Sequence, residues 1–328
     1  MEMLPLWGLL LVIVAMLFVL AKGADLLVEE AVTLSIRWGV PTLVVGATIV
    51  SLGTTLPETA VSVAAALGGR PDLALGNAVG SIICDTGLIL GLGVLLGTIP
   101  LERGILERQS WIQLGAGLLL IALCMPWSSP ATVFETGGRL PQWGGWLLVL
   151  LLVLYIGKTI QWARQSGDTE VPDVDSGRSG WVLVKLGVGI GLVVLSSKVL
   201  IPSVEEFAER LHVPRSVIGA TLVAFGTSLP ELVTVLTSVR KGHGALALGN
   251  VIGADILNVL FVAGTAAAVT RGGLEAEPRF FVLLFPAMLG ILLVFRVSAI
   301  LSGDRLRKWT GWVLLGAYAA VTLLSYRR

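Results

Sequence analysis

Long apolar runs separated by short polar stretches occupy most of this 328-residue chain. Each run is about 20 residues long, which is the length that a helix needs to cross the hydrocarbon core of a bilayer. The runs lack the strict alternation of apolar and polar residues that a transmembrane β-barrel requires. We therefore predict an all-α integral membrane protein with about ten transmembrane helices. The predicted segments are centred in 4–21, 40–66, 73–97, 109–126, 143–163, 181–201, 215–239, 245–269, 279–297 and 309–325.

One part of this pattern occurs twice, 173 residues apart. The sequence GATIVSLGTTLPE at 46–58 returns as GATLVAFGTSLPE at 219–231, and LALGN follows at 73–77 and at 246–250. Each copy begins in the second segment of its half, so segments one to five correspond to segments six to ten. Two copies of an odd number of crossings enter the membrane from opposite sides. The chain is therefore predicted to contain two inverted five-helix repeats.

The most polar stretch of the chain lies between these halves. We predict a first half at 1–164 with its repeat at 46–97, a polar linker at 165–180, and a second half at 181–328 with its repeat at 219–270. The acidic residues of the linker do not have the spacing of an EF-hand loop, which favours a solvated connection.

Composition and charge support this assignment. Charged residues make up 14% of the chain against the usual figure of about 25%, and 55% of the residues are apolar. The net charge of +1 gives no reason to expect a nucleic-acid partner. Of the 23 Lys and Arg, 14 fall in cytoplasmic positions if both termini are outside the cell. The positive-inside rule therefore favours a multi-pass protein of the cell membrane with both termini extracellular.

Two glutamates, Glu58 and Glu231, lie inside apolar segments at equivalent places in the repeats. A carboxylate within a membrane helix costs at least about 2.5–3.5 kcal/mol, so it normally faces the protein interior. A purely structural role could explain one such glutamate, but it explains a duplicated pair with similar flanks less readily. Pro57 and Pro230 directly precede these glutamates, and proline opens the preceding helical turn. Interrupted segments at matching places in two halves indicate a transporter's binding site.

Oxygen ligands surround each predicted break. The proline should free backbone carbonyls such as those of Ser51 and Ala224, and unwound backbone at membrane depth is tolerated where it lines a site. Hydroxyls on the same turn add to them, and hard cations prefer such all-oxygen sets. These hydroxyls belong to Thr54, Thr55, Thr227 and Ser228.

The second segment of each repeat carries a polar stripe. Asn77, Ser81 and Asp85 follow one another at intervals of four residues, which places them on one face of a helix. The equivalent stripe consists of Asn250, Ala254 and Asn258. The second repeat therefore keeps the face but lacks one hydroxyl and one carboxylate. Asp255 lies one residue off this stripe, so the spacing favours a place outside the ion site.

An inverted arrangement would bring Glu58, Glu231, Asp85 and Asn258 together near the membrane midplane. Three carboxylates at such short range do not all stay ionised without cations. One divalent ion leaves such a site negative, whereas two or three monovalent ions or protons bring it toward neutrality. A site that is stable only when filled with one ion set or the other favours obligatory antiport.

These residues resemble signatures of the cation/calcium antiporter superfamily, in particular its prokaryotic sodium/calcium exchanger branch. GTTLPE at 53–58 and GTSLPE at 226–231 resemble the family's GTSLPE signatures. GNAVGS at 76–81 and GNVIGA at 249–254 resemble its GNxxGS signatures. The resemblance implies that Glu58 and Glu231 bind both Ca2+ and Na+, and that the first and sixth segments slide across a rigid core. The remaining implied ligands are Thr54, Thr55, Ser81, Asp85, Thr227, Ser228, Asn258 and the carbonyls of Ser51 and Ala224. The polar stripes add Asn77 and Asn250 as candidate ligands.

The chain departs from the family pattern at two places. Typical prokaryotic members carry Asn and then Asp at the positions of Asp85 and Asn258, and Ser at the position of Ala254. The carboxylate has therefore moved to the first repeat, and one hydroxyl ligand of a sodium site is missing.

The leading hypothesis is Ca2+/Na+ antiport by alternating access, without a cofactor and without an obligatory protein partner. Proton-coupled or K+-dependent exchange is the nearest alternative, favoured by the altered ligands. An intramembrane enzyme is less favoured because the only histidines, His212 and His243, fall at predicted segment ends. A cation channel is also less favoured, because interrupted inverted repeats suit alternating access.

Overall fold

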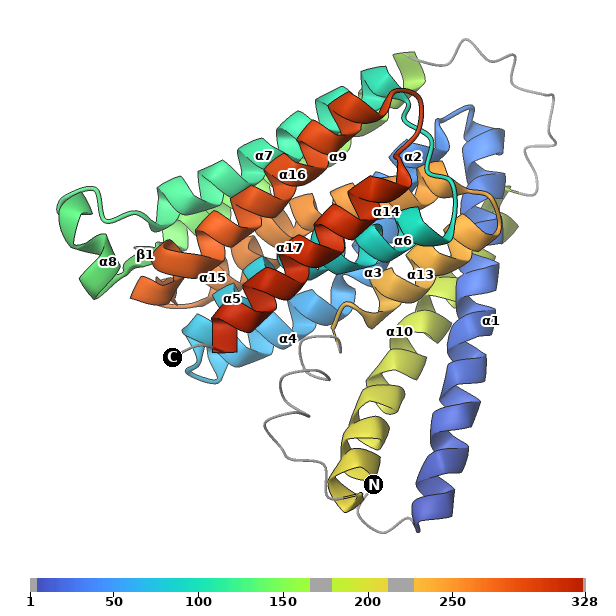
Figure 1. Ribbon diagram of the computed structural model, residues 1–328, viewed down its shortest axis with the longest axis horizontal. Coiled ribbons are helices and arrows are strands. Elements are labelled where there is room, and N and C mark those ends of the chain that lie inside the picture. Colours follow the sequence, from blue (N-terminus) through green and yellow to red (C-terminus); the bar gives the residue numbers. More distant parts are fainter. Residues whose placement is uncertain (1–4, 166–178, 212–226, 327–328) are drawn as a thin grey trace.

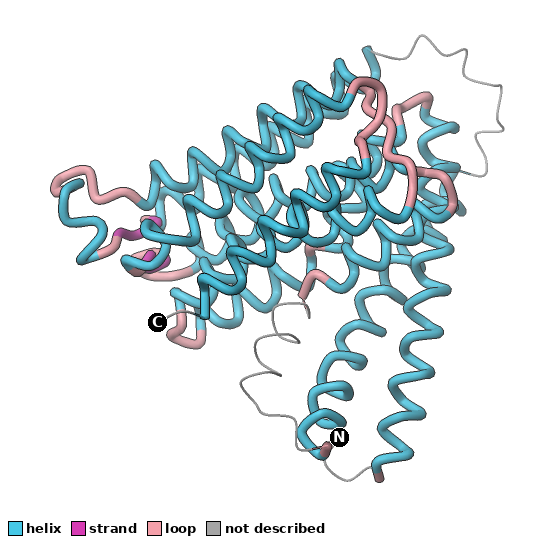
Figure 2. The backbone as a smooth tube through the Cα atoms, viewed as in Figure 1, coloured by secondary structure: helices cyan, strands magenta, loops and turns pink. Residues whose placement is uncertain are grey.

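The computed structural model describes residues 5–165, 179–211 and 227–326, and almost all of this part is helical (Figures 1 and 2). Its helices follow the predicted order. The first half contains α1 (Leu6–Trp38), α2 (Thr42–Val45), η1 (Gly46–Val50), α3 (Ser51–Thr54), α4 (Leu56–Leu67), α5 (Pro71–Cys84), η2 (Asp85–Ile89), α6 (Leu90–Leu96), α7 (Arg103–Cys124), the short η3 (Pro130–Thr132) and α8 (Val133–Thr136), and α9 (Gln142–Gln165). The second half contains α10 (Ser179–Arg210), α13 (Leu229–Arg240), α14 (Gly244–Leu257), η6 (Asn258–Ala263), α15 (Gly264–Val269), η7 (Phe280–Leu284), α16 (Phe285–Ser302) and α17 (Lys308–Tyr326).

Several of these helices have the length and composition of membrane spans. Within the described residues, six helices are long and apolar enough to cross a membrane. The bent pair formed by 42–54 and 56–67 brings this number to seven. The predicted segment 215–239 falls partly outside the described residues. Within them, α13 corresponds to the second part of this segment. The linker 165–180 also lies mostly outside them.

Two short β contacts join the halves at opposite ends of α7 and α16. Beyond the end of α7, β1 (Gly138–Leu140) pairs antiparallel with β2 (Leu274–Ala276), which precedes α16. At the other end, Pro100 before α7 forms a bridge with Arg305 after α16. In the first contact, the loop after α7 meets the loop before α16. In the second contact, the loop before α7 meets the loop after α16. This is the relation expected of two repeats inserted in opposite directions.

The helix α14 forms the centre of the molecule. Its best membrane-spanning window, within Gly244–Val269, is 94% buried, whereas that of α1 is only 22% buried. Glycines let α14 approach η1 and α3 closely. A Cβ atom at Gly253 would lie 2.5 Å from both the Ala47 carbonyl oxygen and Ser51 Oγ. The second segment of the second repeat is therefore packed against the first segment of the first repeat through backbone contact.

The helices α1 and α10 pack along each other and project beyond the other helices (Figure 1). Glycine again permits the contact, since a Cβ at Gly23 would lie 2.8 Å from Leu192 Cβ. Lys185 Nζ on α10 lies 2.9 Å from Glu30 Oε1 on α1. These contacts make the first helices of the two halves a paired unit.

A second ion cluster ties α1 to the turn after α13. Lys241 Nζ lies 2.7 Å from Glu29 Oε1 and 3.0 Å from Asp25 Oδ1. Partial burial alone lowers the pKa of Lys241, but the hydrogen bonds to Glu29 and Asp25 outweigh it and raise the pKa above its usual range. Lys241 is therefore charged at neutral pH.

Candidate cation site

Each of the two glutamates lies in the first turn of a helix whose second residue is a proline. Glu58 follows Pro57 in α4, and Glu231 follows Pro230 in α13. The helices before and after the first break are bent by 44°. A carboxylate in the first turn interacts favourably with the positive end of the helix dipole. Both glutamates are buried, with an exposed fraction of 1% each.

The break does not free the Ser51 carbonyl, so this expectation is wrong. The Ser51 oxygen accepts a hydrogen bond from Thr55 N–H at 2.9 Å and from Thr54 Oγ1 at 3.3 Å. The proline instead removes the N–H that would reach the carbonyl of Gly53, four residues earlier. The equivalent residue of the second repeat, Ala224, lies outside the described residues.

Two hydrogen bonds between the repeats are equivalent to each other under the pseudo-twofold symmetry. Thr54 Oγ1 donates to Asn250 Oδ1 at 3.4 Å, and Thr227 Oγ1 donates to Asn77 Oδ1 at 3.3 Å. In both pairs a hydroxyl at the break of one repeat meets the amide at the start of the other repeat's polar stripe. The two breaks therefore meet the opposite repeats in equivalent ways.

Asp85 and Asn258 occupy equivalent positions and contact each other directly. Asn258 Nδ2 lies 3.4 Å from Asp85 Oδ2, across a sequence separation of 173 residues. A contact between equivalent residues places this pair on the pseudo-twofold axis. Each residue also begins a π-helical turn, η2 or η6. Such turns are rare and often occur at functional sites.

The carboxyl groups around this axis are buried and incompletely hydrogen-bonded. Glu58 interacts electrostatically with Glu231 and Asp85. No described Lys or Arg forms an ion pair with any of these three groups. Buried side-chain oxygens without a hydrogen-bond partner include both of Glu58, Oδ1 of Asp85 and Asn258, and Oε2 of Glu231. Such atoms need either a proton or a cation to offset their desolvation.

The remaining predicted ligands differ in whether a hydrogen bond joins them to this centre. Thr55 Oγ1 donates to Glu231 Oε1 at 3.4 Å, and Ser228 is buried beside Asp85. Ser81 is buried as well. Asn77 Nδ2 donates to Ser62 Oγ at 2.9 Å and to the Glu58 carbonyl oxygen at 3.4 Å, and Ser51 Oγ donates to the Thr48 carbonyl at 3.3 Å.

Acidic side chains alone do not form a metal cage in this structure. Among the described residues, no three His, Cys, Asp or Glu side chains are grouped to hold a metal ion. A cation at this centre would also need hydroxyl, amide or backbone oxygens. Ca2+ takes six to eight oxygen ligands of this mixed kind.

A second polar cluster, which the sequence did not predict, surrounds Asp255. Asp255 Oδ2 accepts hydrogen bonds from Thr86 Oγ1 and from Gln113 Nε2, the latter at 2.5 Å. Gln113 belongs to α7, outside the repeats. The available signal was a glutamine inside an apolar run, but the sequence does not say which way that helix faces.

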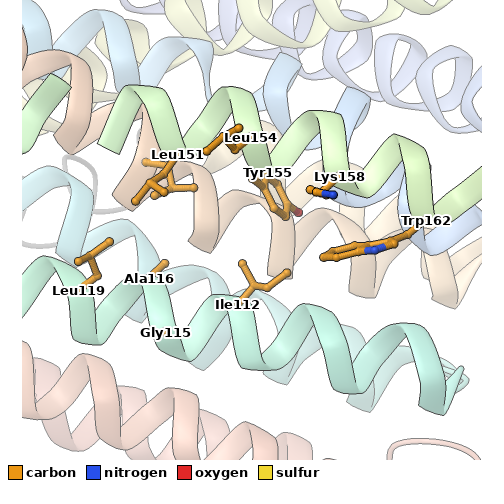
Figure 3. A pocket seen from close by; sticks show the side chains of 10 residues that line it. Ile112, Gly115, Ala116, Leu119, Leu151, Leu154, Tyr155, Lys158 and Trp162 are labelled. Atoms are coloured by element: carbon orange, nitrogen blue, oxygen red, sulfur yellow. The ribbon is translucent and has the colours of Figure 1, made fainter. Parts of the chain in front are cut away.

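The open grooves of the protein lie elsewhere. Figure 3 shows one of about 340 Å3 between α7 and α9, with Ile112 and Leu151 among its apolar side chains and Lys158 and Trp162 toward one end. Tyr155 also lines it, and its hydroxyl lies 3.2 Å from the Ala47 carbonyl. The predicted ligands do not line this groove.

Comparison with solved structures supports the same architecture. The chain is similar over its whole length to the sodium-calcium exchanger NCX_Mj. A form soaked with 10 mM Na+ and zero Ca2+ has a TM-score of 0.82 at 24% identity, covering 99% of this chain and 100% of that one. A form soaked with zero Na+ and Ca2+ has a TM-score of 0.79 at 28% identity, covering 97% and 99%. The fold is therefore that of a membrane exchanger built from two inverted repeats.

Sequence comparison identifies full-length relatives. The chain is 31% identical to the inner membrane protein YrbG of Escherichia coli, with 96% of each chain covered. It is 30% identical to the sodium/calcium exchanger MaX1 of Methanosarcina acetivorans, with 96% of this chain and 98% of the relative covered. The model of the sodium/calcium exchanger protein family matches residues 8–160 and 181–327. This multi-pass membrane protein belongs to the sodium/calcium exchanger family.

Proposed function

We propose that this protein is a secondary active antiporter that exchanges Ca2+ for Na+ across the cell membrane. The observation that carries the proposal is the buried group of Glu58, Glu231 and Asp85, four of whose six carboxylate oxygens lack hydrogen-bond partners. MaX1 and NCX_Mj are both named as sodium/calcium exchangers, which supports the choice of ions. Neither a cofactor nor a catalytic step is needed.

Glu58 and Glu231 are the proposed central ligands of both ions. Their oxygens face a junction with hydroxyl donors from both repeats, and Asp85 and Asn258 complete the set on the axis. With three carboxylates and no Lys or Arg paired with them among the described residues, the site needs cations or protons to offset its negative charge. Ca2+ or several Na+ ions offset this charge to different degrees, so each ion set displaces the other. The further proposed ligands are Thr54, Thr55, Asn77, Ser81, Ala224, Thr227, Ser228 and Asn250.

Alternating access is proposed to arise from the paired helices α1 and α10. They contact each other through glycines and project from the bundle as one unit (Figure 1). The ligands lie on other helices, so the pair can slide across the repeats without disturbing the site. Such motion of one bundle against a fixed midplane site is common among inverted-repeat transporters.

The test is ion flux into proteoliposomes that contain the purified full-length protein. An outward Na+ gradient is expected to drive uptake of 45Ca2+, and uptake is expected to stop when choline replaces Na+. A pH gradient imposed without Na+ and an outward K+ gradient are the comparison arms. Uptake that responds to the pH gradient and ignores Na+ would refute the proposal in favour of proton-coupled exchange.

A further inference from the structure

One arginine lies inside an apolar membrane helix without a carboxylate partner. Arg296 belongs to α16, six residues before that helix ends at Ser302. An arginine within a membrane helix is costly and normally faces a group of opposite charge. Among the described residues, no Asp or Glu forms an ion pair with Arg296. Its guanidinium can therefore bind an anion that the chain itself does not supply.

Two neighbouring residues of α7 hold this guanidinium in one orientation. Arg296 Nη1 donates to Ser110 Oγ at 2.5 Å, and Arg296 Cζ lies 3.8 Å from the centre of the Trp111 ring. The Ser110 hydroxyl donates to the Glu107 carbonyl at 3.1 Å, so it serves Arg296 only as an acceptor. A guanidinium stacked on an aromatic ring keeps its other N–H groups in one plane, where two of them match the oxygens of a phosphate. The side chain is therefore preorganised for a phosphate.

Arg296 lines an open groove that carries charges of both signs. The groove has a volume of about 300 Å3 and lies between the start of α7 and the end of α16. Arg103 and Glu107 of α7 line it together with Arg296, and most of its other side chains are apolar, such as Leu106 and Ile300. Within the described residues, Arg103 and Glu107 form no ion pair either. The groove therefore offers two cations and one carboxylate beside an apolar wall.

The groove lies where lipid headgroups meet the protein. The start of α7 lies beside the end of α16, because the segments that flank these two ends form a β-bridge. Arg103 is the first residue of α7, and Arg296 is about 9 Å from the end of α16 at a rise of 1.5 Å per residue. Exposed Leu293 and Val297 share a helix face with Ile300 and continue the apolar wall toward the membrane interior. A phospholipid can therefore place its head in the groove and its acyl chains along α16.

From this arrangement we infer that the groove binds a phosphatidylethanolamine molecule of the bilayer. The lipid phosphate accepts hydrogen bonds from Arg296 and Arg103, and the primary ammonium donates to the Glu107 carboxylate. Arg103 and Glu107 are four residues apart on one helix, which places their Cβ atoms about 5–6 Å apart, and only two carbons separate phosphate from ammonium in this headgroup. A purely anionic headgroup would be repelled by Glu107, and phosphatidylcholine has no N–H to donate. The inference goes beyond the proposed function, since it does not involve the transported ions.

Lipid binding to the purified protein tests this inference without using transport. The full-length protein is delipidated in detergent and mixed with dioleoyl phosphatidylethanolamine, phosphatidylcholine or phosphatidylglycerol. Native mass spectrometry then gives the dissociation constant of the first bound lipid in each series. The wild type is expected to bind phosphatidylethanolamine at least about tenfold more tightly than the other two lipids, because only this headgroup has a charge-assisted partner for each charge in the groove.

Substitutions on the two sides of α7 separate this groove from the rest of the surface. Arg296→Gln should weaken phosphatidylethanolamine binding by about tenfold or more, because the main contact to phosphate is lost. Glu107→Gln should bring phosphatidylethanolamine and phosphatidylglycerol to within about threefold of each other, since the ammonium loses its partner and the anionic lipid is no longer repelled. Arg108→Gln is the matched control. The Arg108 guanidinium stacks on Trp162 at 4.5 Å, beside the groove between α7 and α9, so all three dissociation constants should stay unchanged.

Equal affinity of the wild type for the three lipids would overturn the inference. So would tightest binding of phosphatidylglycerol, which would make the groove a site for anionic lipids in general. Unchanged phosphatidylethanolamine binding by Arg296→Gln would contradict it as well. If Arg296→Gln does not fold, Arg103→Gln at the exposed start of α7 takes its place, and it should weaken phosphatidylethanolamine binding by at least about threefold.

Discussion

At the residue scale, the two membrane glutamates, Glu58 and Glu231, are the central ligands of the proposed site. Both are buried, both follow a proline, and both retain an oxygen without a hydrogen-bond partner. Their buried environment means that removing the charge does not open the structure to water. The cost of substitution should therefore appear in ion binding rather than in folding.

We expect Glu58→Gln and Glu231→Gln each to reduce Na+-driven 45Ca2+ uptake to below about a tenth of the wild-type rate, since a lost full-charge ligand costs more than about 1.4 kcal/mol. Thermal unfolding in detergent should be unchanged or higher, because an unpaired buried charge has been removed. Surface Glu275→Gln, whose carboxylate pairs with Arg139, is the control for loss of a glutamate. Near-normal uptake by either membrane variant would exclude that residue as a central ligand.

The axis pair allows a stricter test. Because Asp85 and Asn258 contact each other at equivalent positions, exchanging them moves the carboxylate across the axis without changing the composition of the site. Asp85→Asn alone should alter Ca2+ affinity or ion dependence while some ion binding remains. The double variant Asp85→Asn with Asn258→Asp should recover at least about a third of wild-type uptake, a deficit of under 1 kcal/mol.

Flux and ion-dependence measurements on the two single variants and the double variant form one cycle. Coupling between the sites appears as recovery in the double variant beyond the product of the single effects. Additive losses would mean that the two positions do not share one ion, contrary to the geometry of the pair.

At the scale of elements, the helices were more predictable than the turns within them. Long apolar runs located the helices from α5 to α17 because a membrane allows few alternatives to a helix. The π-helical turns at Asp85 and Asn258 were not predictable, since they depend on packing between distant segments. The Asp255 cluster was missed for the same reason. Its partner Gln113 lies on a helix whose orientation the sequence does not reveal.

Close helix contact through Gly253 gives a prediction at this scale. In Gly253→Ala the new methyl group would lie 2.5 Å from the Ala47 carbonyl and from Ser51 Oγ, so backbone must shift. We expect a destabilisation of about 1–3 kcal/mol, as for other overpacked sites. The measure is a fall in the midpoint of thermal unfolding in detergent. Gly115→Ala is the control, since no described atom lies within 4 Å of its added Cβ. Equal midpoints for the two variants would contradict the close contact.

For the whole molecule, the exchanged loop contacts support the inverted arrangement most directly. The pairing of β1 with β2 and the bridge between Pro100 and Arg305 lie at opposite ends of α7 and α16. The sequence repeat predicted this inversion from an odd number of crossings. Which end faces the cytoplasm is a separate question, on which only the distribution of Lys and Arg bears.

The orientation prediction follows from charge. Placing 14 of the 23 Lys and Arg inside requires both termini outside, because ten crossings return the chain to its starting side. A C-terminal alkaline phosphatase fusion in bacteria should then be active and a C-terminal green fluorescent protein fusion dark. The same reporters inserted in the linker 165–180, after five crossings, should give the opposite result and serve as the internal control. An active phosphatase at the linker together with a fluorescent C-terminus would reverse the predicted orientation but keep the inverted repeat. The same reporter result at both places would require an even number of crossings in the second half, which would contradict the inverted repeat.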